Sequence, residues 1–212
     1  MKIVVIGGTG LIGSRVVSGL KALGHEAVAA SPNTGVNTLT GQGLAEVLAG
    51  ADHVALSVVG TDRLTSSGYF RAKLAQEALI KASPTPWTIL RSTQFFPFVA
   101  GIIQSGSVGD EVHLSSAMVQ PVAAEDVVEA LIELVLAAPL NDTIEIAGPE
   151  PIRMDAFARE YLAAQEDRRT VVAEPEGLYF GSVIDDGSLT PGPGSRIGRI
   201  TLEDWLRTLS AD

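Results

Sequence analysis

Three side chains in the middle of the sequence are suited to act together on a carbonyl group. Ser57 ends an apolar run, and Tyr69 and Lys73 follow it four residues apart. On a helix, this spacing puts the tyrosine and the lysine on one face. The tyrosine can give or take a proton, the lysine can lower the tyrosine pKa and bind a ribose, and the serine can polarise a carbonyl oxygen. The trio predicts catalysis of hydride transfer to a carbonyl compound.

A tyrosine and a lysine four apart are common by chance, so this interpretation depends on a second motif. The stretch KIVVIGGTGLIGSRVV, residues 2–17, places three glycines between a β-rich run and a helical one. Gly7 permits a tight turn, Gly10 lets backbone N–H groups approach a pyrophosphate, and Gly13 lets the helix pack close to the strand. A glycine turn that serves packing alone is the alternative, but the position and the flanks both favour dinucleotide binding. The predicted cofactor-binding residues here are Gly7, Thr9, Gly10, Leu11, Ile12, Gly13 and Arg15.

The end of the second expected strand bears on which dinucleotide binds. Proteins that bind NAD usually carry an acidic residue there to hold the ribose hydroxyls. This chain instead has Ser31, Asn33 and Thr34, which do not repel a 2′-phosphate and can donate hydrogen bonds to it. Arg15 can add positive charge, or can face solvent on its helix. The sequence favours NADP(H) and leaves NAD(H) possible.

Short apolar runs alternate with longer amphipathic stretches along the chain. This pattern predicts an α/β fold of Rossmann type, in which helices cover both faces of a doubly wound parallel sheet. The expected strands are 3–6, 26–30, 53–58, 87–90, 143–147 and 170–173, and the expected helices are 11–23, 42–49, 67–82, 124–137, 154–165 and 202–209. We assign residues 1–148 to a dinucleotide-binding domain and 149–212 to a small C-terminal lobe that packs on it.

Composition excludes several other classes of site and partner. The 212 residues include no cysteine, so disulfides, thiolate nucleophiles and cysteine-bound metals are absent, and the three histidines stand singly, which predicts no metal site. A net charge of −10 argues against nucleic acid as a partner. The apolar stretch 95–103 is too short to span a bilayer. We expect a soluble cytoplasmic protein that takes a small-molecule substrate.

The same motifs resemble a known family. The glycine turn, Ser57 and Tyr69-x-x-x-Lys73 are similar to the short-chain dehydrogenase/reductase superfamily. Three stretches, IVVIGGTGLIGS, YFRAKLAQEALIKASPTPWTILRSTQFF and QPVAAEDVVEAL, resemble its atypical, NmrA-like branch of NAD(P)H-binding proteins. The resemblance implies that ILRSTQFF passes over the nicotinamide, and so adds four cofactor-binding residues: Ser92, Thr93, Gln94 and Phe95.

The resemblance leaves two functions open. Some members of the branch reduce quinones, dyes or other small carbonyl and unsaturated compounds, and others bind the cofactor as sensors without turnover. Retention of Ser57, Tyr69 and Lys73 favours the reductase, because a sensor needs no proton relay. Relatives often dimerise through the helix that carries the tyrosine, which makes a homodimer possible here.

The sequence departs from the family pattern in two places. Ser57 comes only 44 positions after Gly13, so one strand-helix unit of roughly 30 residues is missing near residues 52–53. A natural shortening, a deliberate one and a stretch omitted from the given sequence would each account for this gap. A shortened chain that folds but binds nothing well is a third functional alternative. In addition, Ser31 stands where NADP-preferring relatives often carry arginine, which keeps NAD possible.

Overall fold

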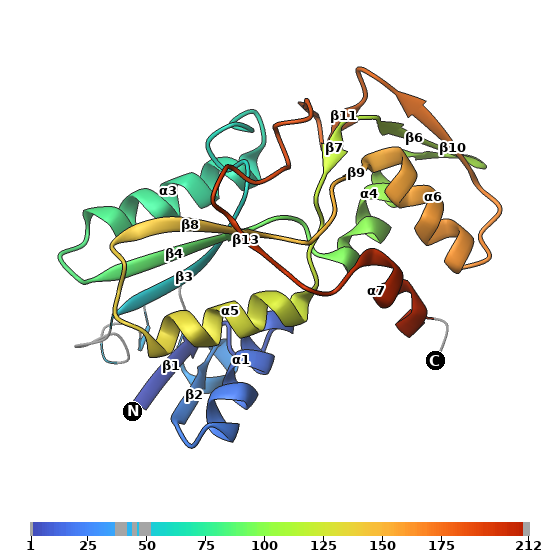
Figure 1. The fold of residues 1–212 in the computed structure, drawn as a ribbon. Helices are drawn as coiled ribbons and strands as arrows, with labels where there is room; N and C mark the ends of the chain where they lie inside the picture. Colours follow the sequence, from blue (N-terminus) through green and yellow to red (C-terminus); the bar gives the residue numbers. More distant parts are fainter. Residues whose placement is uncertain (1, 37–41, 44–45, 47–51, 210–212) are drawn as a thin grey trace.

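The computed structural model describes residues 2–36, 42, 43, 46 and 52–209, and its described part is built from two packed regions (Figure 1). The first region contains a four-stranded parallel sheet in the order β13-β8-β4-β3. Its strands are β3 (His53–Val58), β4 (Trp87–Ser92), β8 (Asp142–Ala147) and β13 (Arg196–Ile197). Helix α3 (Gly68–Ala82) packs on β3 and β4 from one side, and α5 (Ala124–Leu136) packs on them from the other.

The N-terminal strands form a separate parallel pair. Strand β1 (Lys2–Ile6) pairs in register with β2 (Glu26–Ala30), and α1 (Leu11–Ala22) connects them. Between α1 and α5, the buried side chains of Val17, Leu20 and Leu131 form one apolar contact. Gly19 allows the close approach, because a Cβ at this position would collide with the side chain of Ile132. The short 3-10 helix η1 (Pro32–Thr34) follows β2.

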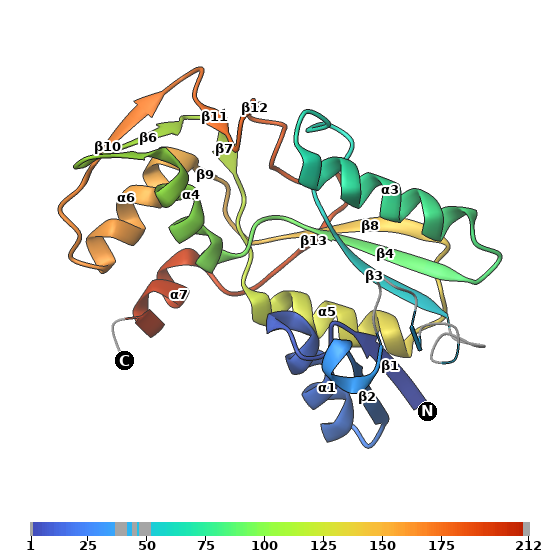
Figure 2. The ribbon, with the colours of Figure 1, turned by 180° about the vertical axis from the view of Figure 1, so that it is seen from behind.

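The second region forms a lobe over the carboxyl end of the main sheet (Figure 2). Strand β6 (Glu111–Ser115) pairs with β10 (Thr170–Glu174) and β5 (Ser107–Val108), and α4 (Val99–Gly106) and α6 (Met154–Ala164) pack on β6. The remaining elements are short: η2 (Phe96–Phe98), β7 (Met118–Val119), β9 (Ile152–Arg153), β11 (Leu178–Tyr179), β12 (Ser182–Val183) and α7 (Leu202–Leu209).

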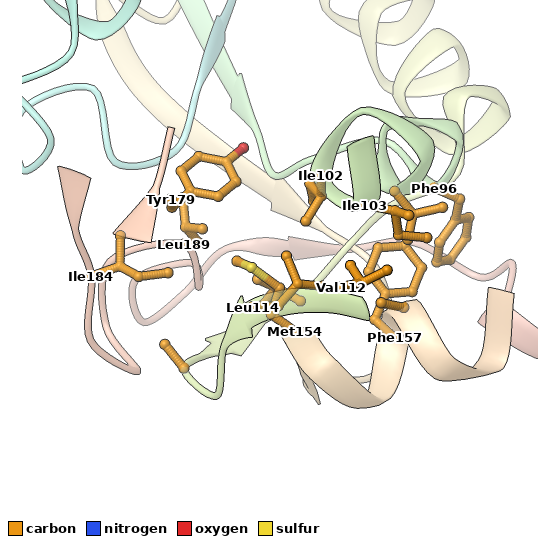
Figure 3. Packing of buried hydrophobic residues seen from close by; sticks show 14 of the residues in the cluster. Phe96, Ile102, Ile103, Val112, Leu114, Met154, Phe157, Tyr179, Ile184 and Leu189 are labelled. Carbon is orange, nitrogen blue, oxygen red and sulfur yellow. The ribbon is translucent and has the colours of Figure 1, made fainter. Parts of the chain in front are cut away.

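Each region has its own apolar core. The core of the lobe contains Phe96, Phe157 and Met154 and extends to Tyr179 (Figure 3). Trp205 of α7 stacks on Phe96, with 5.4 Å between the ring centroids, and so anchors the last helix. Residues 96–119, which precede the expected domain boundary at 148/149, contribute to this core, and β13 returns from the lobe to the main sheet. The chain therefore passes between the two regions more than once.

The α/β class with parallel strands is confirmed, and so are the six expected strands, which differ from the observed ones by at most two residues at an end. Five of the six expected helices are confirmed, whereas the sixth, at 42–49, falls largely outside the described residues. Hydrogen bonds do not join β1 or β2 to the four-stranded sheet within the described part, so the sheet is not continuous. No strand lies between β2 and β3 there, where the sequence lacks its strand-helix unit. In the described ranges, no helix has the length and apolarity to cross a membrane.

Candidate functional site

The glycine turn joins β1 to α1 and leaves the start of that helix uncovered. Gly7 has a φ of +74°, a conformation that favours glycine, and its N–H donates to Ala30 O of β2 at 2.8 Å. A Cβ at Gly13 would fall inside contact distance of the Gly7 carbonyl group. Gly10, the N-cap, offers no side chain to the helix, and the first turn of α1 holds no acidic residue. The N–H groups of Gly8 and Gly10 also donate to backbone carbonyls within the turn. The N–H groups of residues 11–13, in the first turn of α1, precede the first hydrogen bond of the helix, from Ser14 N–H to Gly10 O, and are therefore available to an anion.

The other predicted cofactor-binding residues around this turn differ in solvent exposure and in whether they already have a partner. Thr9 and Leu11 are exposed and Ile12 is half-buried. Arg15 forms an exposed ion pair with Glu125. The Arg15 guanidinium is thus already partnered by a carboxylate at the surface.

Ser31 follows β2 and has a buried hydroxyl. Its Oγ makes no hydrogen bond to any described residue. By contrast, the Thr34 hydroxyl accepts from the Ser31 N–H at 2.7 Å and donates to the Ser31 carbonyl at 3.0 Å, and Asn33 is exposed. A buried hydroxyl without a partner is unfavourable, and a ribose hydroxyl or phosphate oxygen would satisfy it.

Helix α3 places Tyr69, Lys73 and Glu77 on one face at four-residue intervals. Tyr69 stands in its first turn and is 58% exposed. The Lys73 ammonium donates to the carbonyl of Leu56, on the edge strand β3, at 3.1 Å. Burial lowers the pKa of Lys73, and the charge of Glu77 partly opposes this effect.

The pKa of Tyr69 is raised by burial, so the expected lowering by Lys73 is not found. The reason is the direction of the lysine side chain, which binds β3 and the Gln76 side-chain oxygen. In this arrangement the phenol is protonated at neutral pH and is a proton donor.

The hydroxyl of Ser57 is not brought beside Tyr69. Ser57 is 5% exposed and donates to Glu77 Oε1 at 2.6 Å, two helical turns beyond Tyr69 on α3. Ser57 and Arg91 are register partners on β3 and β4, so both side chains face α3. This contact does not test the predicted catalytic role of Ser57, which stays a prediction.

Glu77 and Arg91 form a buried ion pair that the sequence analysis missed. Arg91 Nε and Nη2 donate to the two carboxylate oxygens of Glu77 at 2.9 and 2.8 Å, and Nη1 donates to Asp62 at 3.2 Å. Burial tends to raise the pKa of Glu77, but hydrogen bonds from Arg91 and Ser57 outweigh it, so this pKa lies below its ordinary value. An arginine within the apolar run WTILRS was the available signal, because a buried charge needs a partner.

A polar cavity of about 530 Å³ opens beside this pair. The charged residues that line it are Asp62, Arg63, Lys81, Arg91 and Glu145, and residues 192–195 also contribute to its wall. Lys81 lies 3.5 Å from Glu77, and Glu145 accepts from the Gly192 N–H. Together with Glu77, which pairs with Arg91, the two lining carboxylates balance the three lining basic groups, so the cavity has no excess of positive charge for a dinucleotide.

The end of β4 leads into the second predicted cofactor segment. Ser92, Thr93 and Gln94 are buried, and the Thr93 hydroxyl donates to the Gln120 carbonyl at 2.6 Å. Phe95 is half-buried and packs on the core around α1 and α5. Gln94 is 6% exposed, and neither polar atom of its amide has a hydrogen-bond partner among the described residues. Gln94 is thus similar to Ser31, because each carries an unpartnered polar group just after the carboxyl end of a parallel strand.

Solved structures share this arrangement of strands and helices. A dTDP-4-dehydrorhamnose reductase from Bacillus anthracis, in complex with NADP, has a TM-score of 0.63 at 14% identity, with 99% of this chain and 97% of that chain covered. An NADPH-dependent quinone oxidoreductase from Escherichia coli also has a TM-score of 0.63, at 16% identity over 98% of this chain and 99% of that one. The chain has their fold. A short-chain dehydrogenase/reductase superfamily protein from Agrobacterium tumefaciens with bound NAD gives 0.62 at 14% identity, covering 100% and 96%.

Sequence comparison adds no narrower assignment. No family model matches the chain, and no curated protein matches it at a significant level. At 14–16% identity, the solved structures support the fold and leave the chemistry to be argued from the site.

Proposed function

We propose that the chain is an NAD(P)H-dependent oxidoreductase that prefers NADP(H) and reduces a small carbonyl or quinone-like compound. The observation that carries the proposal is that no side chain caps the N-terminus of α1, next to a glycine turn that leaves no room for a Cβ at Gly13. In α/β folds, phosphates bind at such a helix start, beyond the carboxyl ends of the strands.

The residues present fit a nicotinamide dinucleotide. The turn residues would hold the pyrophosphate, and the unpartnered hydroxyl of Ser31 would meet the adenosine ribose or its phosphate. Gln94 and its neighbours at the end of β4 would lie at the nicotinamide end. When bound, the reduced nicotinamide supplies a hydride, and Tyr69 supplies the proton. The solved structures named above support this proposal, because one is a reductase in complex with NADP and another is an NADPH-dependent quinone oxidoreductase.

Nucleotide titration tests the proposal. Calorimetry with NADPH, NADP⁺, NADH and NAD⁺ should show tighter binding of the phosphorylated pair, since residues 31–34 offer hydroxyl and amide groups and no carboxylate. Ser31→Ala should weaken that pair by about tenfold, the effect of one lost hydrogen bond to a charged group. The proposal fails if none of the four binds to the folded chain.

Phenylalanine in place of Tyr69 should remove turnover and leave nucleotide affinity unchanged. The phenol stands at an exposed position, so the substitution removes one hydroxyl and little packing. We expect kcat to fall by about 10²–10⁴-fold in NADPH oxidation with a panel of aldehydes and quinones. Unchanged turnover would exclude Tyr69 as the proton donor.

The pH profile gives a second test of the same residue. Because the pKa of Tyr69 is raised, the protonated form persists into alkaline solution. The value of kcat/KM should therefore stay level through neutral pH and decline only above the usual range of phenols. A decline near neutral pH would mean that Lys73 turns towards Tyr69 and lowers its pKa when the site is filled.

The sensor alternative is favoured by one observation. Ser57 is held by Glu77 and Lys73 by the Leu56 carbonyl, so the expected relay with Tyr69 is not assembled in the chain alone. A sensor would bind NADPH and NADP⁺ with different affinities and oxidise NADPH with no member of the panel. Turnover that depends on Tyr69 would exclude it.

A further inference from the structure

A short hairpin of the lobe docks beside the start of α3. Strands β11 and β12 pair antiparallel, with Tyr179 directly opposite Ser182. The Ser182 hydroxyl is buried and lies 2.8 Å from the hydroxyl of Ser66, three residues before Tyr69. Side chains of directly opposed residues share a face of the hairpin. The contact with Ser66 therefore brings Tyr179 to the side of the hairpin that faces the Tyr69 turn.

Tyr179 belongs to the apolar core of the lobe, but its side chain ends in a polar hydroxyl. Its ring is buried near Leu189 and Ile184, and its hydroxyl points away from both of them (Figure 3). Burial strongly raises the pKa of Tyr179, the proximity of Tyr69 adds to the rise, and the Gln94 amide opposes it. Tyr179 therefore remains a neutral hydrogen-bond donor at neutral pH, and Tyr69 and Gln94 are near enough to influence its pKa.

Gln94 supplies the second observation that points to a ligand. A buried amide without hydrogen bonds of normal geometry costs about 1–3 kcal/mol. Neither polar atom of Gln94 makes such a bond within the described residues, although the amide is near enough to Tyr179 to influence the pKa of the phenol. Its position, directly after β4, is beyond the carboxyl end of the sheet, where ligands bind in folds of this class.

We propose that Tyr179, positioned by Gln94, is the second hydrogen-bond donor to the substrate's carbonyl or quinone oxygen, in place of Ser57. The inference rests on the proposed function and identifies how the substrate oxygen is held. Ser57 is unsuited to this role, because its hydroxyl is buried against Glu77, two turns along α3 from Tyr69.

The chemical step balances with two phenols. The hydride would come from a C–H bond of the reduced nicotinamide, which would be oxidised to NAD(P)⁺ as the new C–H bond forms on the substrate carbon. The electron pair of the C=O bond moves to the substrate oxygen, which takes the proton of Tyr69. Tyr179 keeps its proton and donates a hydrogen bond to the same oxygen, so that it stabilises the charge that develops there. Tyr69 is exposed and regains its proton from water.

The test uses menadione as the probe and the full chain. Its binding is measured by ligand-observed NMR without nucleotide, and its reduction is measured with NADPH. Tyr179→Phe should weaken menadione binding about tenfold, lower kcat/KM about 10²-fold and leave NADPH affinity unchanged. Ser57→Ala should leave menadione binding unchanged. Tyr161→Phe, which alters a phenol stacked on Trp205 in the same lobe, is the matched control and should have no effect.

In this scheme Gln94 positions Tyr179. Gln94→Leu, alone and combined with Tyr179→Phe, tests whether Gln94 has this role or only a structural one. Gln94→Leu should be at least as stable as the parent chain, because it removes an unpartnered buried amide, yet it should weaken menadione binding. The double variant with Tyr179→Phe should bind no more weakly than Tyr179→Phe alone.

Two results would overturn the inference. One is equal menadione binding by the parent chain and Tyr179→Phe, and the other is no menadione binding by either. Failure of NADPH to bind, with menadione binding still dependent on Tyr179, would instead refute the oxidoreductase and leave the oxygen-binding role of Tyr179 standing.

Discussion

Alanine in place of Gly13 should abolish tight nucleotide binding and destabilise the chain. The added Cβ would enter the Gly7 carbonyl group and lie 2.8 Å from its carbon and 2.9 Å from the Gly8 Cα. All of these are backbone atoms, so the turn or the start of α1 must move. Overpacking of this kind costs about 1–3 kcal/mol. Displacement of the N–H groups should weaken NADPH by at least about tenfold, which corresponds to about 1.4 kcal/mol.

Gly101→Ala is the matched control for this substitution. Gly101 lies on α4, where an added Cβ makes only an ordinary contact with the Phe98 ring at 3.7 Å. Alanine is a better helix former than glycine by about 0.5–1 kcal/mol, so this variant should be slightly more stable and bind NADPH normally. Calorimetry and urea unfolding measure both effects. Normal NADPH affinity in Gly13→Ala would mean that the nucleotide does not use the turn.

Local elements could be predicted from the sequence because their signals are local. Strand β3 was placed at its observed bounds, since an apolar run there is followed by glycine and polar residues. The glycine turn was likewise readable, because its spacing and flanks lie within 16 residues. The sequence does not indicate how the strands pair: no hydrogen bonds join β1 or β2 to β3 or β4 in the described part, and this depends on packing between segments distant in sequence.

The candidate site was predictable only in part, for a similar reason. Residue spacing indicated that Tyr69 and Lys73 share a face of α3, but it could not indicate that Lys73 binds a carbonyl of β3. Nor could it indicate that Ser57 faces Glu77, because that contact depends on the register between β3 and β4. The place of Tyr179 in the site could not be predicted either, because its hairpin is irregular in sequence and is positioned by the contact between Ser182 and Ser66.

Leucine in place of Glu77 should destabilise the chain more than any surface substitution. It leaves the Arg91 guanidinium, whose side chain is 10% exposed, paired only with the exposed Asp62 and removes the partner of Ser57. Breaking a buried pair in this way costs about 3–5 kcal/mol. Urea unfolding of the parent chain and the variant at neutral pH measures the difference.

The pH dependence of that difference follows from the lowered pKa of Glu77. A carboxylate whose pKa is lower in the folded state stabilises the fold above its unfolded pKa, ordinarily 4.5, and this contribution is lost as pH falls through the folded value. The gap in stability between the parent chain and Glu77→Leu should therefore be constant at neutral pH and narrow in acid, below pH 4.5.

Two further variants decide whether the buried charge is responsible. Glu133→Gln breaks an exposed pair with Arg196 and should change stability by less than about 1 kcal/mol. Glu77→Leu combined with Arg91→Leu removes both charges, and replacing a buried pair by apolar side chains is often neutral or stabilising. The double variant should therefore be more stable than Glu77→Leu. If it is less stable, the Arg91 side chain stabilises the fold through packing and its hydrogen bond to Asp62, and the unpaired guanidinium is not the cause.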